Sequence, residues 1–338
     1  MELSPLAHAA CSPAQRELWQ GLALSTRQAD PFCSGPVWQL SFHAALTPLC
    51  RPHVHADGDS LLAFAEQPLP SGRLALAPLE SYWFFGSPLL GAHAPELLAD
   101  WLAAQARRLS YMPRLVISGI RPDGRRAAGL VRRFDSHFQL LRIAGGLQSA
   151  ASLRGGLDGF LSRRSANHRQ KLAKAARRAR QADIVFERHV PRDAGEADAL
   201  YARMLAVESA SWKGLGACGM TEMPARRLYA VLLRNLAQHG MARIILARHE
   251  ERDIGFIFGG TTGTVYRGQQ FSYHNAWKRW SIGNLLQVEQ VRWLCEEGVT
   301  RYDMGPLDSE AMRYKAHWTE RRLPIQTWLL IPRQGQDA

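Results

Sequence analysis

The chain has 338 residues, of which 46% are hydrophobic and 21% charged, and a net charge of +12. This composition predicts a folded protein of two domains and excludes a disordered chain. Eight of the positive charges lie between Arg163 and Arg180 with no acid among them, and the rest of the chain carries about +4. The basicity is therefore local, which favours one anion-binding surface.

Five cysteines are scattered along the chain without a CxxC pair, a pattern of neither a disulfide framework nor a zinc site. A reducing cytoplasm is the expected location. No stretch approaches 18 uninterrupted apolar residues, and the start of the chain lacks a basic segment followed by a long apolar one. We therefore expect neither export nor membrane insertion.

The first half reads as mixed α/β. The pattern predicts strands at 60–66, 74–86 and 114–120 and an amphipathic helix at 94–109. A segment of small residues, AGGLQSAASLRGG, ends this half and places a domain boundary near residue 150. We therefore predict domains at 1–150 and 151–338, although such a segment is also typical of a loop inside one fold.

A basic helix is predicted at 160–181, because apolar residues recur there at three- and four-residue steps. One interpretation is an ordinary solvated helix face. The other is an anion site, for which the candidate residues are Arg169, Lys174, Arg177 and Arg178. Aromatic residues for base stacking are not interleaved with the charges. A helix that binds phosphates or the acceptor is therefore favoured over one that binds nucleic acid in general.

The second half is more regular. Helices are predicted at 196–212 and 225–240, followed by three strands at 242–249, 254–262 and 264–273. A strong helix at 281–298, a short strand at 301–305, a helix at 308–318 and a strand at 323–332 complete the chain, the last strand closing the sheet. A helix joining two strands implies that the strands at 264–273 and 301–305 are parallel.

This order resembles the fold of the Gcn5-related N-acetyltransferases, the GNAT superfamily. The segments ADIVFERH, ESASWKGLGACGM, WSIGNLL and RYDMGPLDSEAMRYKAHW resemble the branch that holds Fem-type peptidyltransferases and the cellulose-biosynthesis-type acetyltransferases. The resemblance covers most of the chain. It implies an α/β fold with a mixed sheet and two GNAT-like domains in tandem, the first degenerate and the second more complete.

The segment RWSIGNLL begins the helix at 281–298. A helix N-terminus offers unpaired N–H groups and a partial positive charge that suit a pyrophosphate. Candidate cofactor-binding residues are Arg279, Ser281, Ile282, Gly283 and Asn284. The GNAT pattern is Gln/Arg-x-x-Gly-x-Gly/Ala; here Arg279 lies one residue too far from Gly283, and Leu285 replaces the last small residue. The alternative is a glycine that merely starts a packed helix.

In ESASWKGLGACGM, Glu208 ends a helical pattern and a glycine-rich loop follows. Such a loop can close over a substrate, with Trp212 and Lys213 as binding residues. Glu208 would then accept a proton from an amine, as a general base in a partly dry site. A capped helix end with an exposed acid and a packing Trp explains the pattern equally well.

The segment RYDMGPLDSEAMRYKAHW follows the parallel strand, where open α/β sheets commonly bind ligands. Candidate substrate residues here are Tyr302, Asp303 and Trp318. The Fem resemblance implies catalytic roles for Tyr314 and Lys315, with the ammonium of Lys315 stabilising a developing oxyanion. The alternative is a surface lysine beside a core tyrosine.

The histidines give weaker signals. His53 and His55 would share a strand face, but two histidines without a third ligand predict no metal site. His274, at the end of a central strand, is a candidate for proton transfer or a structural histidine. Nothing resembles a nucleophile elbow, a P-loop or a dinucleotide fingerprint.

The resemblance predicts an acyltransferase that moves an acyl group from acyl-coenzyme A, such as acetyl-CoA, to an amine of a small molecule or peptide by direct attack. One alternative is a Fem-like transferase that uses aminoacyl-tRNA, whose phosphates the basic helix would follow. Another is a non-catalytic GNAT-like module that binds RNA or a protein partner.

Overall fold

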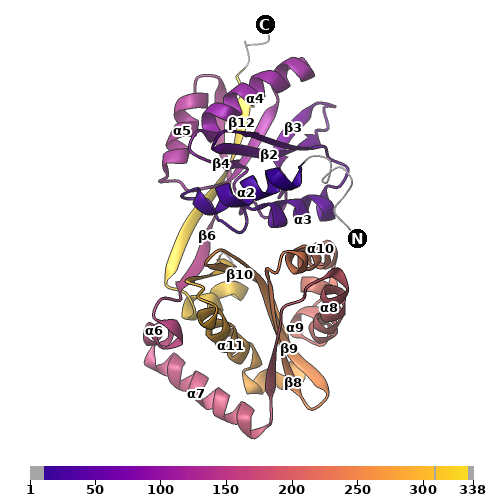
Figure 1. The fold of residues 1–338 in the computed structure, drawn as a ribbon, viewed down its shortest axis with the longest axis vertical. Helices are drawn as coiled ribbons and strands as arrows, with labels where there is room; N and C mark the ends of the chain where they lie inside the picture. The colour runs from indigo at the N-terminus through magenta and orange to yellow at the C-terminus, as the bar shows by residue number, and fades with distance from the viewer. Residues whose placement is uncertain (1–10, 308–309, 334–338) are drawn as a thin grey trace. The chain divides into compact units, whose positions relative to one another are not determined.

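The computed structural model describes residues 11–307 and 310–333. The chain divides into two compact units, one that runs to Leu147 and includes the chain from Leu323, and one that spans Gln148–Arg322. The chain passes to the second unit within β6 (Phe138–Ser152) and returns within β12 (Arg321–Pro332) (Figure 1). Among the described residues, no helix has the length and apolar character needed to cross a membrane.

The first unit is a mixed sheet with helices. Its strands follow the order β1-β2-β3-β5-β12-β6, and β4 pairs with β2. The strands are β1 (Pro52–Asp57), β2 (Ser60–Pro68), β3 (Leu74–Pro78), β4 (Leu89–Leu90) and β5 (Arg114–Ile120). The helices are α2 (Pro13–Ser25), α3 (Pro36–Leu46), α4 (Ala94–Leu109) and α5 (Arg125–Phe134).

The second unit has the strand order β6-β11-β10-β9-β8-β7. Its strands after β6 are β7 (Val185–His189), β8 (Ala242–His249), β9 (Arg252–Thr262), β10 (Val265–Tyr273) and β11 (Arg301–Pro306). Its α-helices are α6 (Gly156–Ser162), α7 (Ala166–Gln181), α8 (Ala194–Ser209), α9 (Trp212–Leu215), α10 (Ala225–Gln238) and α11 (Ile282–Glu296). Three 3₁₀ segments are η1 (Gly219–Thr221), η2 (Asn275–Trp280) and η3 (Glu310–His317).

The two units share one topology. In the first, antiparallel β1, β2 and β3 are followed by α4 and by β5, which is parallel to β3. In the second, antiparallel β8, β9 and β10 are followed by α11 and by β11, which is parallel to β10. The predicted mixed α/β fold and the parallel pair around the crossover helix are confirmed.

The strand predicted at 74–86 ends at Pro78, and three elements of the second half also differ from expectation. The helix predicted at 160–181 is two helices, because Ser165 accepts the N–H of His168 and starts α7 anew. The last strand, placed by the sequence in a domain 151–338, pairs with β5, and its Leu330 packs in the first unit's core. The segment predicted as a helix at 308–318 forms η3, and its residues 308–309 lie outside the described part, as do the first ten residues of the chain.

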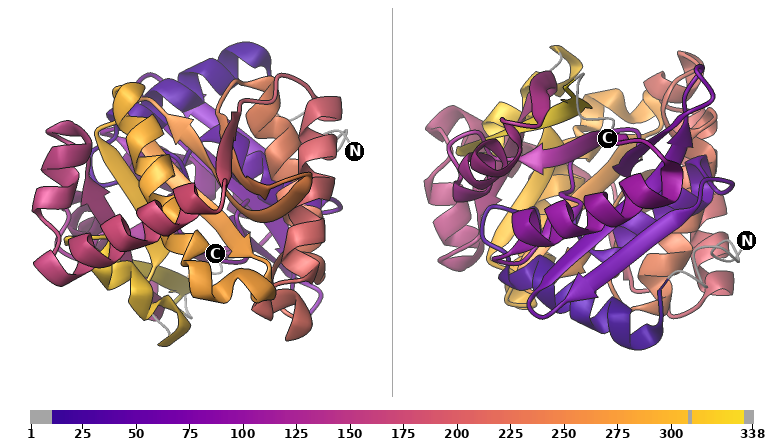
Figure 2. Two further views of the ribbon diagram at one scale, coloured as in Figure 1. Left: turned by 90° about the horizontal axis from the view of Figure 1, so that it is seen from below. Right: turned by 90° about the horizontal axis from the view of Figure 1, so that it is seen from above.

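The helix α7 packs along α11 in the second unit (Figure 2). Ala175 and Ala179 of α7 share one hydrophobic core with Ile282, Leu285 and Leu286 of α11. The small alanine side chains let the two helices approach closely. The basic residues of α7 are thereby placed beside the beginning of α11.

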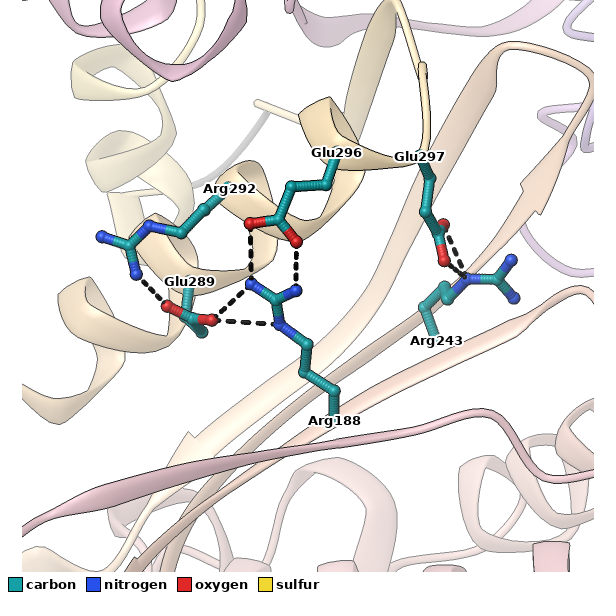
Figure 3. A network of polar contacts seen from close by, with 6 residues as sticks. All are labelled: Arg188, Arg243, Glu289, Arg292, Glu296 and Glu297. Carbon is teal, nitrogen blue, oxygen red and sulfur yellow. Dashed lines mark hydrogen bonds and ion pairs between the residues drawn. The ribbon is translucent and has the colours of Figure 1, made fainter.

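A polar network holds the other end of α11 to the sheet (Figure 3). Arg188 of β7 donates to Glu289 at 2.7 Å and to Glu296, and its guanidinium lies 5.6 Å from the ring centroid of Trp293. Arg243 of β8 donates to Glu297 at 2.8 Å. These charge-assisted bonds fix α11 across the strands, and with it the position of its N-terminus.

We expect Arg188→Ala to lower the free energy of unfolding by about 1 to 2 kcal/mol, because the variant loses both carboxylate contacts and the stacking on Trp293. Arg188 holds the pKa of Glu296 below its usual value through their hydrogen bond. The stabilisation is therefore present above the ordinary glutamate pKa and declines as the pH falls through the lowered one.

Urea unfolding at several pH values measures this difference. The control is Arg192→Ala, which removes an exposed pair with Glu196 and should leave stability unchanged. Equal stability of Arg188→Ala and wild type at neutral pH would contradict the role given to the network.

Candidate functional site

A pocket of about 490 Å³ opens in the second unit, bounded by β10, the N-terminus of α11, α9 and η3. Nine of the residues predicted from the sequence line it: Trp212, Lys213, Ser281, Gly283, Asn284, Tyr302, Tyr314, Lys315 and Trp318. Segments separated by about a hundred residues in the chain thus meet at one place. The volume suits part of a small ligand rather than a whole macromolecule.

The N-terminus of α11 forms one wall of the pocket. Ser281 adopts the left-handed conformation, with φ of 57°, and its carbonyl accepts the N–H groups of Asn284 and Leu285. The N–H groups of Ile282 and Gly283 come before the first intrahelical hydrogen bonds, so they are available to an anion. Leu285, which departs from the GNAT pattern, is buried in the core shared with α7.

Gly283 is needed for packing against β10. A Cβ atom at this position would lie 2.9 Å from the ring of Phe271 and 3.1 Å from that of Tyr273. Both rings also line the pocket. The glycine therefore lets α11 begin directly on the strand that forms the pocket floor. Close packing of Gly283 and access of a ligand to the helix N-terminus are thus compatible.

Lys213 lies on α9 with its ammonium toward the pocket. Its Nζ donates to Gln270 Oε1 at 2.7 Å and to the Phe271 carbonyl at 2.9 Å. Burial lowers the pKa of Lys213, and the nearby Glu208 carboxylate opposes this shift. The short helix α9 is thereby tied to β10.

Lys315 is buried at 5% exposure on η3, and its Nζ donates to the Pro306 carbonyl at 2.7 Å. It is therefore not the surface lysine of the alternative interpretation. Tyr314 packs edge-to-face on Phe271 with ring centroids 5.4 Å apart, and burial raises the pKa of its phenol. The structure thus places the Tyr-Lys pair at the pocket beside β10.

The remaining aromatic residues of the pocket are anchored in its walls. Tyr302 donates to Gln287 Oε1 of α11 at 2.8 Å. Trp318 is 2% exposed and meets His168 of α7 edge-to-face at 5.0 Å. These contacts hold the pocket between the sheet, α11 and α7.

Besides the four predicted anion-binding residues, five predicted catalytic, substrate or cofactor residues do not line the pocket. Glu208 is fully buried, with Oε1 accepting the Met220 N–H at 3.1 Å and lying 3.9 Å from Lys213 Nζ. Asp303 is buried in a bidentate pair with Arg301. His274 caps η2 by accepting the Ala276 N–H. Ile282 is a core residue, and Arg279 is exposed. Glu208 thus lies next to the pocket residue Lys213 without lining the pocket itself.

The basic stretch divides into a structural part and an exposed part. Arg164 is 6% exposed, pairs with Glu320 and lies 4.4 Å from the Phe160 ring centroid. Arg169, predicted to bind anions, donates to the Arg164 carbonyl at 2.6 Å and so ties the first turn of α7 to the connection before it. Lys174 and Arg177 are exposed.

Arg178 connects α7 with the start of α11. Its guanidinium lies 5.1 Å from the ring centroid of Trp280, the residue before Ser281. It therefore adds positive charge beside the helix N-terminus.

The sequence did not single out the polar residues of β10. The register shifts between Gly268 and Gln270, so Gln269 is an extra residue in a β-bulge at the pocket. Among the described residues, Gln269 Nε2 and Ser272 Oγ are buried without a hydrogen-bond partner. The tripeptide GQQ gave a faint signal, because a glycine inside a strand often marks a bulge.

The equivalent position in the first unit is closed. Gly91, before α4, would place a Cβ 2.0 Å from the Asp59 carbonyl, and Ser60 Oγ accepts the His93 N–H at 3.1 Å. Pro95, in the first turn of α4, has no N–H to offer. The turn between β1 and β2 thus lies directly against the segment that leads into α4.

Comparison with solved structures gives the fold of the chain. The chain is similar to the crystal structure of FemX, with a TM-score of 0.67 and 11% identity over 92% of this chain and 95% of that one. It is also similar to a conserved protein of unknown function from Bacteroides thetaiotaomicron VPI-5482, with a TM-score of 0.64 and 11% identity over 96% of this chain and 98% of the other. The structure of L-PGS from Bacillus licheniformis has a TM-score of 0.54 and 15% identity, covering 96% of this chain and 93% of that one. These likenesses show the fold.

The sequence of residues 166–316 matches the family model described as "Acetyltransferase (GNAT) domain". The recognition of a GNAT domain is confirmed, and the chain is an enzyme of the acyltransferase type. The matched range includes α11 and every described residue that lines the pocket except Trp318, which follows η3. Among curated proteins, none matches the chain.

We expect Gly283→Ala to destabilise the second unit by about 1 to 3 kcal/mol, because the added methyl group meets the rings of Phe271 and Tyr273. Gly21→Ala is the control, since this glycine lies within α2 with nothing within 4 Å of its Cβ position. It should be neutral or stabilising. Melting curves of the two variants measure the effect, and an unchanged Gly283→Ala would mean that α11 does not start as close to β10 as described.

Proposed function

We propose that the protein transfers an acyl group from acyl-coenzyme A to the amine of a small-molecule or peptide acceptor. The observation that carries this proposal is the meeting of the open N-terminus of α11 and the buried Lys315 in one pocket of a GNAT domain. The donor supplies a thioester carbonyl. The acceptor amine attacks it, a C–N bond forms, the C–S bond breaks, and the thiolate leaves.

The donor phosphates fit the beginning of α11. The free N–H groups of Ile282 and Gly283 point along the helix axis, where the helix dipole adds positive charge. Arg178 beside Trp280, and Lys278 at the pocket, supply full charges on the same side of the domain. These groups would bind and orient a pyrophosphate without any metal ion.

Lys315 supports the reaction itself. Its ammonium is held by the Pro306 carbonyl at the pocket wall, so little reorganisation is needed to face an oxyanion. The buried donors Gln269 Nε2 and Ser272 Oγ are further groups that a bound substrate would satisfy.

The second candidate is transfer from aminoacyl-tRNA. It is favoured by the exposed basic residues Lys174 and Arg177 of α7, which lie outside the pocket. A nucleic acid carries its phosphates over a longer distance than coenzyme A, so it would use this outer face as well.

Thermal shift distinguishes the donors. We expect acetyl-CoA to raise the melting temperature of the wild type, because binding to the native state stabilises it. Arg178→Glu should abolish most of this shift, since it places a negative charge beside the α11 N-terminus. Arg252→Glu, on the exposed start of β9, is the control and should keep the shift. Stabilisation by aminoacyl-tRNA and not by acetyl-CoA would support the second candidate instead.

We expect Lys315→Met to lower the single-turnover rate by roughly 100-fold while donor affinity changes little, as for an interaction made in the transition state. Donor affinity by calorimetry and the melting temperature are measured on the same preparation. A near-normal rate at saturating donor would remove Lys315 from the mechanism.

A further inference from the structure

The distribution of lysine in this chain is uneven. The 42 basic residues include only five lysines, Lys171, Lys174, Lys213, Lys278 and Lys315, and the other 37 are arginines. Three of the five lysines line the pocket. Arginine stays protonated in proteins, whereas lysine can lose its proton in a buried site. A chain that otherwise uses arginine for positive charge therefore places three of its five lysines, whose ammonium groups can lose a proton, at the pocket.

The two hydrogen bonds of Lys213 match the two N–H groups of a neutral amine, which is the form that a general base requires. Its Nζ has two hydrogen-bond acceptors, Gln270 Oε1 at 2.7 Å and the Phe271 carbonyl at 2.9 Å. A neutral amine has two N–H groups and one lone pair, so these two acceptors use both of its hydrogens. The nearest carboxylate oxygen, Glu208 Oε1, is 3.9 Å away and beyond hydrogen-bond distance. The lone pair is left for the pocket that Lys213 lines.

The acceptors of Lys213 are themselves fixed. Gln270 Nε2 donates to Tyr229 Oη at 2.9 Å, so its Oε1 is turned to the lysine.

Gly219 passes so close to Glu208 that a Cβ there would lie 2.3 Å from Oε1. Glu208 therefore fixes the loop behind α9, and it has no opening to the pocket.

The other described residues of the pocket suit the removal of a proton from an amine less well than Lys213, and Lys278 is exposed to solvent. No aspartate, glutamate or histidine is among the described lining residues. Burial raises the pKa of both Tyr302 and Tyr314, so their phenols stay protonated. Lys315 donates to the Pro306 carbonyl and has its role as a cation.

We propose that Lys213 is the general base of the acyl transfer and that Glu208 is a positioning residue behind it. This inference rests on the proposed function. As the amine nitrogen attacks the carbonyl carbon, its proton moves to the lone pair of Lys213 Nζ. The tetrahedral intermediate then collapses to the amide and the thiolate, and the ammonium of Lys213 returns its proton to solvent after the product leaves.

The groups that face Lys213 set its protonation. Burial lowers its pKa, and the charges of Glu208 and of the Cys218 thiol act in the opposite direction. The hydroxyl of Tyr229 reaches it through Gln270. Replacing Glu208 by glutamine should therefore move the titration of Lys213 to lower pH, whereas a residue with only a structural role would not shift it.

The ionisation of Lys213 is measurable without any acyl donor. Lysine labelled with ¹³C at Cε gives five resonances from the full chain, assigned by single Lys→Arg variants. We expect Lys213 to titrate below Lys171, which is exposed on α7, and Glu208→Gln to lower it further. A Lys213 resonance that titrates together with Lys171 would overturn the proposal, whatever the donor is.

Kinetics provides the second measurement. Lys213→Arg keeps the positive charge but cannot act as a base, so its single-turnover rate at saturating acetyl-CoA should fall by roughly 100-fold or more, with unchanged donor affinity. Lys171→Arg is the matched control and should keep the rate. The wild-type rate should rise with pH as Lys213 deprotonates, and Glu208→Gln should shift that rise to lower pH.

A near-normal rate of Lys213→Arg would also overturn the proposal. If the wild type transfers no acyl group from acetyl-CoA, the proposed donor is wrong, and the labelled-lysine titration still decides whether Lys213 is neutral. The melting temperature of Lys213→Arg shows whether a lost rate reflects unfolding of the second unit.

Discussion

The close contact between the start of α11 and β10 is the constraint on which the second unit depends. Gly283 lies so near the rings of Phe271 and Tyr273 that any side chain would push the helix away from the strand. This contact brings the open N–H groups of α11 to the pocket. The network of Arg188 and Arg243 fixes the opposite end of the same helix. The helix terminus that we propose for anion binding is thereby held rigidly against the strand that carries the bulge.

The basic stretch after residue 160 serves two purposes. Among its first arginines, Arg164 pairs with Glu320 and Arg169 donates to a backbone carbonyl, so they are part of the fold. Arg178 reaches Trp280 and brings positive charge to the α11 N-terminus. Residues of the same type thus differ in role because α7 has one face on α11 and another in solvent. The structure therefore separates the buried from the exposed basic residues, and anion binding by the exposed ones stays a prediction.

Periodicity predicted the elements well where one face is buried. The bounds of α4 and β8 are those expected, because their apolar residues follow one period without interruption. The buried helix α3 was missed, since a helix that is apolar on all sides has no periodic signal. The return of β12 to the first unit depends on pairing with β5, a long-range contact that local patterns do not contain.

The sequence pointed to the segments that line the pocket, but it did not show the direction of each side chain. Glu208 and Lys213 are five residues apart, and only the turn into α9 turns the lysine to the pocket and leaves the carboxylate behind it. The bulge at Gln269 was not predicted because a bulge is a property of two paired strands.

The central claim is that the pocket binds an acyl-coenzyme A with its phosphates at the start of α11. A crystal structure of the protein with acetyl-CoA tests it most directly. We expect the pyrophosphate on the N–H groups of Ile282 and Gly283, and the thioester carbonyl within reach of Lys315. A donor bound elsewhere on the chain, or phosphates placed away from α11, would contradict it.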